Sequence, residues 1–198
     1  MKKGIRTQTH IAEKAAPLFN TRGFFGTSMR DLLEATGLQK GGLYNHYASK
    51  EALAVAAFDY ALGKFRQRYA EAVQGQASAI NCLHAICAVM LRSYEDPVVA
   101  GGCIVFNTAI ESDDAQPVLK ARAQNAMNDL LRFISVQVKL GQRNGEIQAS
   151  VDPRMVATLL VSIYEGALGL SKLFDDAAHI RRASEHMKTY IESLSRSV

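Results

Sequence analysis

Apolar and polar residues recur with helical spacing over the first 75 positions of the chain, and glycines interrupt the pattern. Four apolar residues follow one another at i, i+4, i+7 and i+8: Ile11, Ala15, Leu18 and Phe19. This spacing predicts a first helix that Thr7 or Thr9 caps and that runs to about Thr21. Gly23 is expected to end the helix. Pro17 is expected to bend it, because proline removes one hydrogen bond inside a helix.

Two short helices and a tight turn follow. Ser28 and Asp31 have the spacing of a capping box, with Asp in place of the usual Glu or Gln, and predict a second helix over residues 29–35. Gly37 breaks this helix, and a third helix is expected over residues 39–47. A short helix, a glycine turn and a second short helix are typical of a helix-turn-helix, which places its second helix in the major groove of DNA.

The remainder of the chain also has helical periodicity. Ser49 can cap a long fourth helix over residues 50–73, and a Gly, Gln and Ser segment at residues 75–78 marks a linker. Five further helices are expected at about residues 79–94, 103–111, 115–141, 153–174 and 177–194. Alternation of period two never continues beyond four residues. The sequence therefore predicts an all-α fold of about nine helices.

Charge is unevenly distributed between the two ends of the chain. The first 50 residues hold eight Lys or Arg and three Asp or Glu, a balance of +5, whereas the remainder holds 15 and 16. Such an excess indicates either a polyanionic partner or a plain solvated surface. The helix-turn-helix lies in this basic part, and its third helix carries Gln39, Lys40 and Asn45, whose side chains can bond to base edges.

Residues 15–53 combine several short motifs without a gap. They read AAPLFNTRGFFGTSMRDLLEATGLQKGGLYNHYASKEAL. An apolar helix ends in a Gly-Phe pair, a Thr follows, and the helix-turn-helix closes on Gly-x-Leu-Tyr-x-His-aromatic and Ser-Lys-Glu-x-Leu. This arrangement resembles the tetracycline-repressor (TetR) family of bacterial transcription regulators. Gly42 stands where Ser or Thr is common in that family, and Asn45 where a larger residue is common, which concerns sequence preference more than fold.

The resemblance implies that the third helix reads DNA. Gly41 would let the backbone approach the duplex without a Cβ in the way, Lys40 would bond to guanine O6 and N7, and Lys50 would hold a phosphate. The DNA-contacting residues implied are Thr27, Ser28, Met29, Arg30, Gln39, Lys40, Gly41, Gly42, Tyr44, Asn45, His46, Tyr47 and Lys50. Two of them have plain alternatives, because Tyr47 can be a core residue and His46 a local cap.

The resemblance also implies two domains: a three-helix helix-turn-helix domain in residues 1–48, and a helical ligand-binding and dimerisation domain in residues 49–198. A homodimer would bind a palindromic double-stranded DNA operator, and a small-molecule effector would release it by changing the separation of the recognition helices. The last two helices carry apolar stripes with small residues, expected at the dimer interface: Leu159, Ile163, Gly166, Leu170, Ile180, Ala183, Met187 and Tyr190. The alternative is that these stripes close the core of one chain.

Few charges in the helices that would line the effector pocket favour an apolar or weakly polar effector. Its pocket would be lined by residues that also suit a plain core: Met90, Cys103, Phe106, Leu130, Phe133, Ile134 and Tyr164. Gly101 and Gly102 would place Cys103 at the start of a helix, where the helix dipole can lower a thiol pKa. Some members of the family that sense electrophiles or oxidants have a similar Gly-Cys. Cys103 is therefore either a sensor of a reactive small molecule or a buried structural thiol.

Other classes of function lack support in the sequence. Cys82, His84 and Cys87 do not converge on one helix face and have no fourth ligand nearby, so we expect neither a metal nor another cofactor. Phosphate-loop and hydrolase motifs are missing, which argues against an all-helical enzyme. About 120 residues beyond the linker argue against a purely architectural DNA-binding protein. The sequence contains neither a secretory signal nor an apolar run of about 18 residues, so we expect a cytoplasmic protein without membrane contact.

Overall fold

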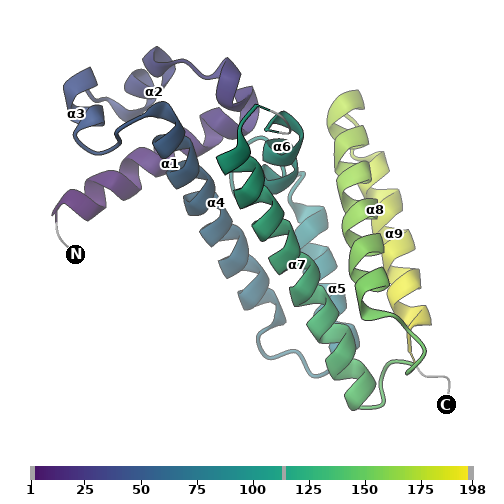
Figure 1. Cartoon of the computed structure of the whole chain (residues 1–198). Helices are drawn as coiled ribbons and strands as arrows, with labels where there is room; N and C mark the ends of the chain where they lie inside the picture. The colour runs from purple at the N-terminus through teal and green to yellow at the C-terminus, as the bar shows by residue number, and fades with distance from the viewer. Residues whose placement is uncertain (1–2, 113–114, 196–198) are drawn as a thin grey trace. The chain divides into compact units, whose positions relative to one another are not determined.

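The computed structural model describes residues 3–112 and 115–195. Nine helices are present in this part of the chain (Figure 1): α1 (Lys3–Gly26), α2 (Met29–Thr36), α3 (Lys40–Tyr44), α4 (Lys50–Val73), α5 (Ala79–Arg92), α6 (Ile104–Glu111), α7 (Pro117–Arg143), α8 (Pro153–Phe174) and α9 (Ala178–Ser193). The one pairing of β type among the described residues is an isolated bridge between Ile147 and Ser195. The predicted all-α fold with an N-terminal helix-turn-helix is confirmed.

Helix α1 begins earlier and ends later than the sequence pattern predicts. Thr9 lies inside the helix, where its hydroxyl donates a hydrogen bond to the carbonyl of Ile5 at 3.0 Å, so neither Thr7 nor Thr9 is the cap. The backbone leaves helical angles at Gly23, with φ of 75°, and then resumes a turn that ends at Gly26. Gly23 therefore interrupts α1 where the sequence places its end, because glycine tolerates this left-handed conformation.

The start of α2 has the predicted capping box, and α3 is shorter than predicted. The Asp31 backbone N–H donates to the Ser28 hydroxyl at 3.2 Å, and the Ser28 N–H donates to the Asp31 carboxylate at 2.8 Å. Gly37, with φ of 68°, ends α2 in a left-handed conformation. The helix α3 ends at Tyr44 rather than at Tyr47, because the chain beyond it turns back toward α1.

The chain forms two compact units whose boundaries fall inside α4 and α7. Unit 1 consists of Met1–Phe65 and Pro97–Ala126, and unit 2 consists of Arg66–Asp96 and Met127–Val198. In unit 1, α1 packs against α2 and α6. Fully buried apolar side chains from the first four helices fill its core: Ile11, Leu32, Leu43 and Leu53. Burial of each such side chain stabilises the fold by roughly 1.5–3 kcal/mol.

Unit 2 is built around α5, α8 and α9, which contact one another. The helices α8 and α9 run side by side in Figure 1, joined by a short turn at Asp175, with φ of 50°. The buried Ser171 hydroxyl accepts a hydrogen bond from the Ile180 N–H at 3.0 Å and so fixes the start of α9. A second buried polar contact joins the hydroxyls of Ser93 and Tyr164, 2.7 Å apart.

The helix α8 is long and apolar enough to cross a membrane if length and hydropathy alone are considered. Half of its most apolar window is buried inside the protein. It therefore resembles the core helix of a folded domain, which commonly passes this test.

Candidate nucleic-acid interface

The helix α3 exposes one face and buries the other. Leu43 is fully buried and anchors the helix on the core of unit 1. The predicted base-reading side chains Gln39, Lys40 and Asn45 are exposed, as is Tyr44. Because these side chains do not pack in the core of unit 1, α3 can approach a partner without losing packing against its own unit. The structure thus leaves the polar side chains predicted to read bases exposed on and beside α3.

Gly41 has no structural need to be glycine within the described chain. A Cβ added there would meet no described atom within 4 Å, and its φ lies outside the left-handed region. Gly42 is similar, with Leu38 Cδ2 at 4.0 Å, which is ordinary contact. Glycine inside a helix costs roughly 1 kcal/mol relative to alanine. A glycine that the protein itself does not require is consistent with close approach of the α3 backbone to something outside the chain.

The residues that follow α3 are hydrogen-bonded to α1. The Tyr47 hydroxyl donates a hydrogen bond to the backbone carbonyl of Gln8 at 3.0 Å, and partial burial raises the pKa of Tyr47. The Gln8 side-chain amide donates to the carbonyl of half-buried His46 at 3.4 Å. Because its only hydroxyl proton is already engaged, Tyr47 serves to hold α3 against α1. Its predicted phosphate contact would need this bond to break.

At the start of α2, the predicted contacts separate into buried and exposed residues. Thr27 is fully buried, and its hydroxyl donates to the Gly23 carbonyl at 2.7 Å. The prediction of a phosphate contact from the Thr27 side chain is therefore wrong, because that side chain stabilises the turn before α2. Ser28 and Arg30 are exposed, and Met29 is half-buried. A hydroxyl that caps a helix from an exposed position can still lie beside a phosphate.

Asp31 and Lys50 have shifted pKa values with different causes. Hydrogen bonds from Ser28 chiefly hold the pKa of the Asp31 carboxyl below its usual value, aided by Arg22, whose guanidinium lies 2.8 Å away. Partial burial lowers the pKa of Lys50, and the negative charge of Glu111 opposes this effect. The Lys50 ammonium lies 4.3 Å from the centre of the Phe24 ring. Such a cation–π contact is favourable and orients the lysine.

The surface of the first 50 residues is rich in cations. Five exposed basic residues contribute to it: Arg6, Lys14, Arg22, Arg30 and Lys40. Asp31 forms an ion pair with Arg22, which leaves seven Lys or Arg against two Glu in the first 50 residues. An excess of exposed cations in the part of the chain that contains α3 has the electrostatics expected of a phosphate-backbone contact.

The predicted effector residues are distributed over both units. Cys103 and Phe106 belong to unit 1, and the others belong to unit 2: Met90, Leu130, Phe133, Ile134 and Tyr164. Met90, Ile134 and Tyr164 are buried, whereas Phe106 is exposed. Cys103 precedes α6 as its N-cap, as predicted, and is only 8% exposed. Its burial favours the structural role over the sensing role.

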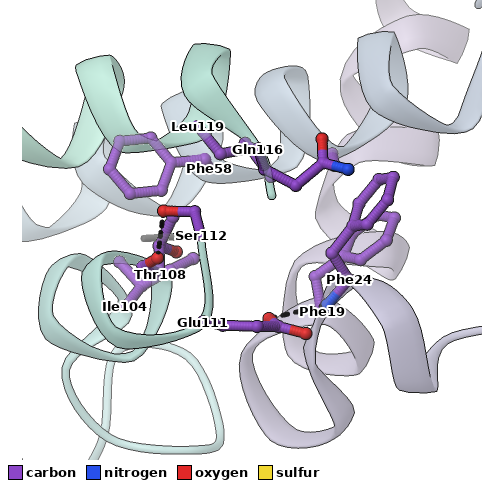
Figure 2. A pocket seen from close by; sticks show the side chains of 10 residues that line it. Phe19, Phe24, Phe58, Ile104, Thr108, Glu111, Ser112, Gln116 and Leu119 are labelled. Carbon is purple, nitrogen blue, oxygen red and sulfur yellow. Dashed lines mark hydrogen bonds between the residues drawn. The ribbon is translucent and has the colours of Figure 1, made fainter. Parts of the chain in front are cut away.

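A small cavity of about 20 Å³ lies in unit 1 between α1, α4, α6 and the start of α7. Aromatic and polar side chains line it, among them Phe19, Phe24, Phe58, Glu111 and Gln116 (Figure 2). This volume suits about one water molecule. The cavity is therefore too small for an organic effector. The sequence did not indicate this cavity, because its walls come from segments far apart in the chain.

The predicted interface residues also divide by burial. Leu159, Gly166 and Leu170 are exposed on α8, and Ile163 and Tyr190 are half-buried. Three residues on α9 are buried inside the single chain: Ile180, Ala183 and Met187. These three belong to the core of unit 2, because α9 packs against α5 and α8, so their prediction as contacts to a second copy is corrected.

The cysteines show no sign of a metal site in the described part of the chain. No group of three or more His, Cys, Asp or Glu side chains converges there. Burial raises the pKa of Cys87 to about 12, and burial together with the charge of Glu146 raises the pKa of Cys82. Thiols that resist deprotonation are poor metal ligands and poor nucleophiles.

Two family models match the chain. One, described as "Bacterial regulatory proteins, tetR family", matches residues 11–57, which include α2, α3 and the start of α4. The other, described as "Tetracyclin repressor-like, C-terminal domain", matches residues 79–187. Together they cover both the helix-turn-helix and the greater part of the helices that follow it.

Similar proteins include a solved structure and two bacterial repressors. The crystal structure of a TetR transcriptional regulator from Chloroflexus aurantiacus J-10-FL is 39% identical, covers 100% of both chains and has a TM-score of 0.95. The transcriptional repressor NemR of Escherichia coli K12 is 23% identical over 93% of this chain and 94% of its own. The repressor DhaR of Mycobacterium sp. strain GP1 is 21% identical over 80% of this chain and 79% of its own.

Proposed function

Because the chain belongs to the TetR family of ligand-responsive, DNA-binding transcriptional regulators, we propose that residues 1–48 bind a palindromic operator and residues 49–198 bind an effector and join two copies. The family is a regulatory one rather than an enzymatic one. The protein acts as a repressor in the cytoplasm, where its DNA target lies. Effector binding releases the operator.

The observation that carries the DNA-binding proposal is the open face of α3. It combines exposed Lys40 and Asn45 with a glycine at position 41 that the protein's own packing does not require. In this account Lys40 reads guanine O6 and N7 in the major groove. Gly41 brings the α3 backbone close to the duplex, and Arg30, Ser28 and Lys50 hold phosphates.

The observation that supports a homodimer is a stripe on α8, which we call the α8 stripe. Its exposed members follow one another at helical spacing: Met155, Leu159, Gly166, Gly169, Leu170 and Leu173. Apolar side chains with small residues between them allow two helices to approach closely. A second copy of this chain is the partner, because a single α3 of five residues reads too few bases for useful specificity.

The proposed release mechanism acts through α4, which begins in unit 1 and ends in unit 2. An apolar or weakly polar effector binds more tightly to the state in which the two recognition helices are wrongly spaced for the operator. Operator affinity then falls by the ratio of the effector's affinities for the two states. Half-sites one helical turn apart, about 34 Å, require this spacing to be held closely.

Selection from a library of random duplexes tests the proposed function. Full-length protein is incubated with the library near physiological salt, and the bound DNA is sequenced after several rounds. The expected result is a palindromic consensus with half-sites about one helical turn, or a multiple of it, apart. Enrichment of no consensus would contradict the proposal, and a consensus with a single half-site would contradict the dimer.

A further inference from the structure

The last residue of α6 holds the kink of α1. One oxygen of the Glu111 carboxylate accepts a hydrogen bond from the Phe24 backbone N–H at 2.8 Å, and the other accepts from the Phe25 N–H at 3.1 Å. Figure 2 shows the carboxylate pointing toward Phe24 from α6. A Cβ on Gly23 would collide with the same carboxylate. The glycine therefore provides both the left-handed turn and the space for Glu111.

A second polar attachment lies one helical turn earlier on both helices. The Asn107 side-chain amide on α6 donates to the Asn20 side-chain oxygen at 2.9 Å and to the Gly101 carbonyl at 2.9 Å. Asn20 in turn donates to the Gly102 carbonyl at 3.0 Å. A Cβ on Gly101 would lie 2.6 Å from the Asn20 carbonyl oxygen. Buried Asn20 and half-buried Asn107 each have several partners and so fix this contact, and Glu111 therefore acts from a helix already held against α1.

The segment that Glu111 holds leads directly into the helix-turn-helix. The Thr27 hydroxyl donates a hydrogen bond to the Gly23 carbonyl, and Ser28 is the N-cap of α2. The ammonium of Lys50, in the first turn of α4, lies over the Phe24 ring. One short turn therefore contacts both the start of α2 and the start of α4, which flank the recognition segment.

The contact between Glu111 and the turn depends on both oxygens of an ionised carboxylate. The break at Gly23 interrupts the hydrogen-bond ladder of α1, and Glu111 accepts from the next two N–H groups. Hydrogen bonds to an ionised acceptor are roughly twice as strong as neutral ones. A glutamine at this position could accept from only one N–H group and would present its own N–H₂ to the other.

We propose that Glu111 is a positioning residue for operator recognition. Its carboxylate sets the geometry of the turn Gly23–Phe25 and, through that turn, the placement of α2 and α3. The inference rests on the proposed function, since it concerns how well a bound operator is read. It assigns a role to a residue on α6, far in sequence from the helix-turn-helix, which touches no DNA itself.

Three single variants test the role: Glu111→Gln, Glu111→Ala and the control Glu95→Gln. Glu95 is exposed on unit 2, so the control makes the same change of charge away from the turn. The probes are the duplex that the wild-type protein selects from the random library and a scrambled duplex of equal length. Both Glu111 variants are expected to lose about tenfold in affinity for the selected duplex, the equivalent of one charged hydrogen bond. Affinity for the scrambled duplex, which depends on phosphate contacts, should change by less than about threefold.

Hydrogen exchange gives a readout at the site itself. The amides of Phe24 and Phe25 should lose protection in Glu111→Gln while the amides of α5 and α8 keep theirs. Equal loss on both duplexes, or unchanged protection at Phe24 and Phe25, would overturn the proposal. If the wild-type protein selects no duplex, the proposed function itself is rejected. If the wild-type protein selects a duplex and Glu111→Gln binds that duplex with unchanged affinity, only the inference about Glu111 is rejected.

Gly23→Ala provides an independent route if Glu111→Ala is too unstable to assay. The new Cβ would displace the carboxylate, so this variant should lose specific affinity as Glu111→Gln does. Adding Glu111→Gln to Gly23→Ala should lower the affinity for the selected duplex little further, because both substitutions remove the same contact. Losses that simply add would show that the two residues act separately and would overturn the proposal.

Discussion

Lys40 and Lys50 carry the same charge but have different surroundings in the structure. Lys40 is exposed on the open face of α3. Lys50 is half-buried, and its ammonium lies over the Phe24 ring. A free ammonium on a recognition helix can select a base, whereas one oriented against the body of the domain suits a fixed phosphate contact.

The two lysines should therefore differ as alanine variants. Lys40→Ala is expected to relax sequence choice at one base pair by about 1–3 kcal/mol. Lys50→Ala should weaken binding to all sequences alike and reduce the slope of the salt dependence by about 1. Titration of duplexes with single base changes, at several salt concentrations, measures both effects. Equal loss of specificity in the two variants would refute these roles.

Cys87 differs from an ordinary thiol because burial raises its pKa to about 12 from 9.0. Since the folded pKa lies above the unfolded one, the stability contributed by the neutral thiol is full below pH 9.0 and is lost as the pH rises toward about 12. At pH 8, iodoacetamide should modify Cys87 much more slowly in folded Cys82→Ser/Cys103→Ser protein than in the same protein in denaturant. Mass spectrometry follows the reaction, and equal rates would show that Cys87 is accessible and ionisable.

At the scale of single helices, α3 combines a poor helix-forming sequence with an exposed position. Gly41 has open space around its Cβ position. Its intrinsic cost to the helix is therefore uncompensated by any packing among the described residues, which points to a use outside the chain.

Gly41→Ala should separate stability from DNA binding. The free energy of unfolding is expected to rise by roughly 0.5–1 kcal/mol, because alanine favours the helix and fits without a clash. Affinity for the selected duplex should fall at least about tenfold if the added Cβ keeps the backbone from the DNA. Urea denaturation and a binding titration measure the pair of effects. A variant that gains stability and keeps full affinity would contradict the role given to Gly41.

The helices with strong local signals were predictable from sequence. The bounds of α4 and α8 match their predictions, since Ser49 accepts from the Ala52 N–H and Asp152 from the Arg154 N–H. The end of α3 was predicted too late: beyond Tyr44 the chain leaves the helix, and the Tyr47 hydroxyl bonds to the Gln8 carbonyl on α1. Local signals cannot report such a contact.

The site was only partly predictable for the same reason. Exposed polar residues of α3 follow from the helix-turn-helix pattern, but the burial of Thr27 in the core of unit 1 does not. Glu111 is 87 residues from Phe24. Neither spacing nor charge marks a residue whose partner is a backbone amide so far along the chain.

At the scale of the whole molecule, the proposed reading of a palindromic operator requires two copies of the chain. The α8 stripe offers exposed apolar and small residues with helical spacing, whereas the buried residues of α9 serve the single chain. A stripe of this kind is costly to leave in water and is suited to self-association.

Leu159→Glu should disrupt the dimer, with Leu140→Glu as the matched control. Both leucines are 40% exposed in the single chain, Leu159 on α8 and Leu140 on α7. A carboxylate on the α8 stripe would meet its own copy across a two-fold axis, so Leu159→Glu should be monomeric by light scattering and should bind the selected duplex at least about tenfold more weakly. Leu140→Glu should stay dimeric. Dimerisation of both variants would place the interface elsewhere.

In the proposed function, a dimer reads DNA sequence through the exposed face of α3. The most direct test is an equilibrium titration of wild-type protein with the selected duplex and with a scrambled duplex near physiological salt. The affinity for the selected duplex is expected to exceed the affinity for the scrambled duplex by about 10³ or more. Equal affinity for the two duplexes would contradict it.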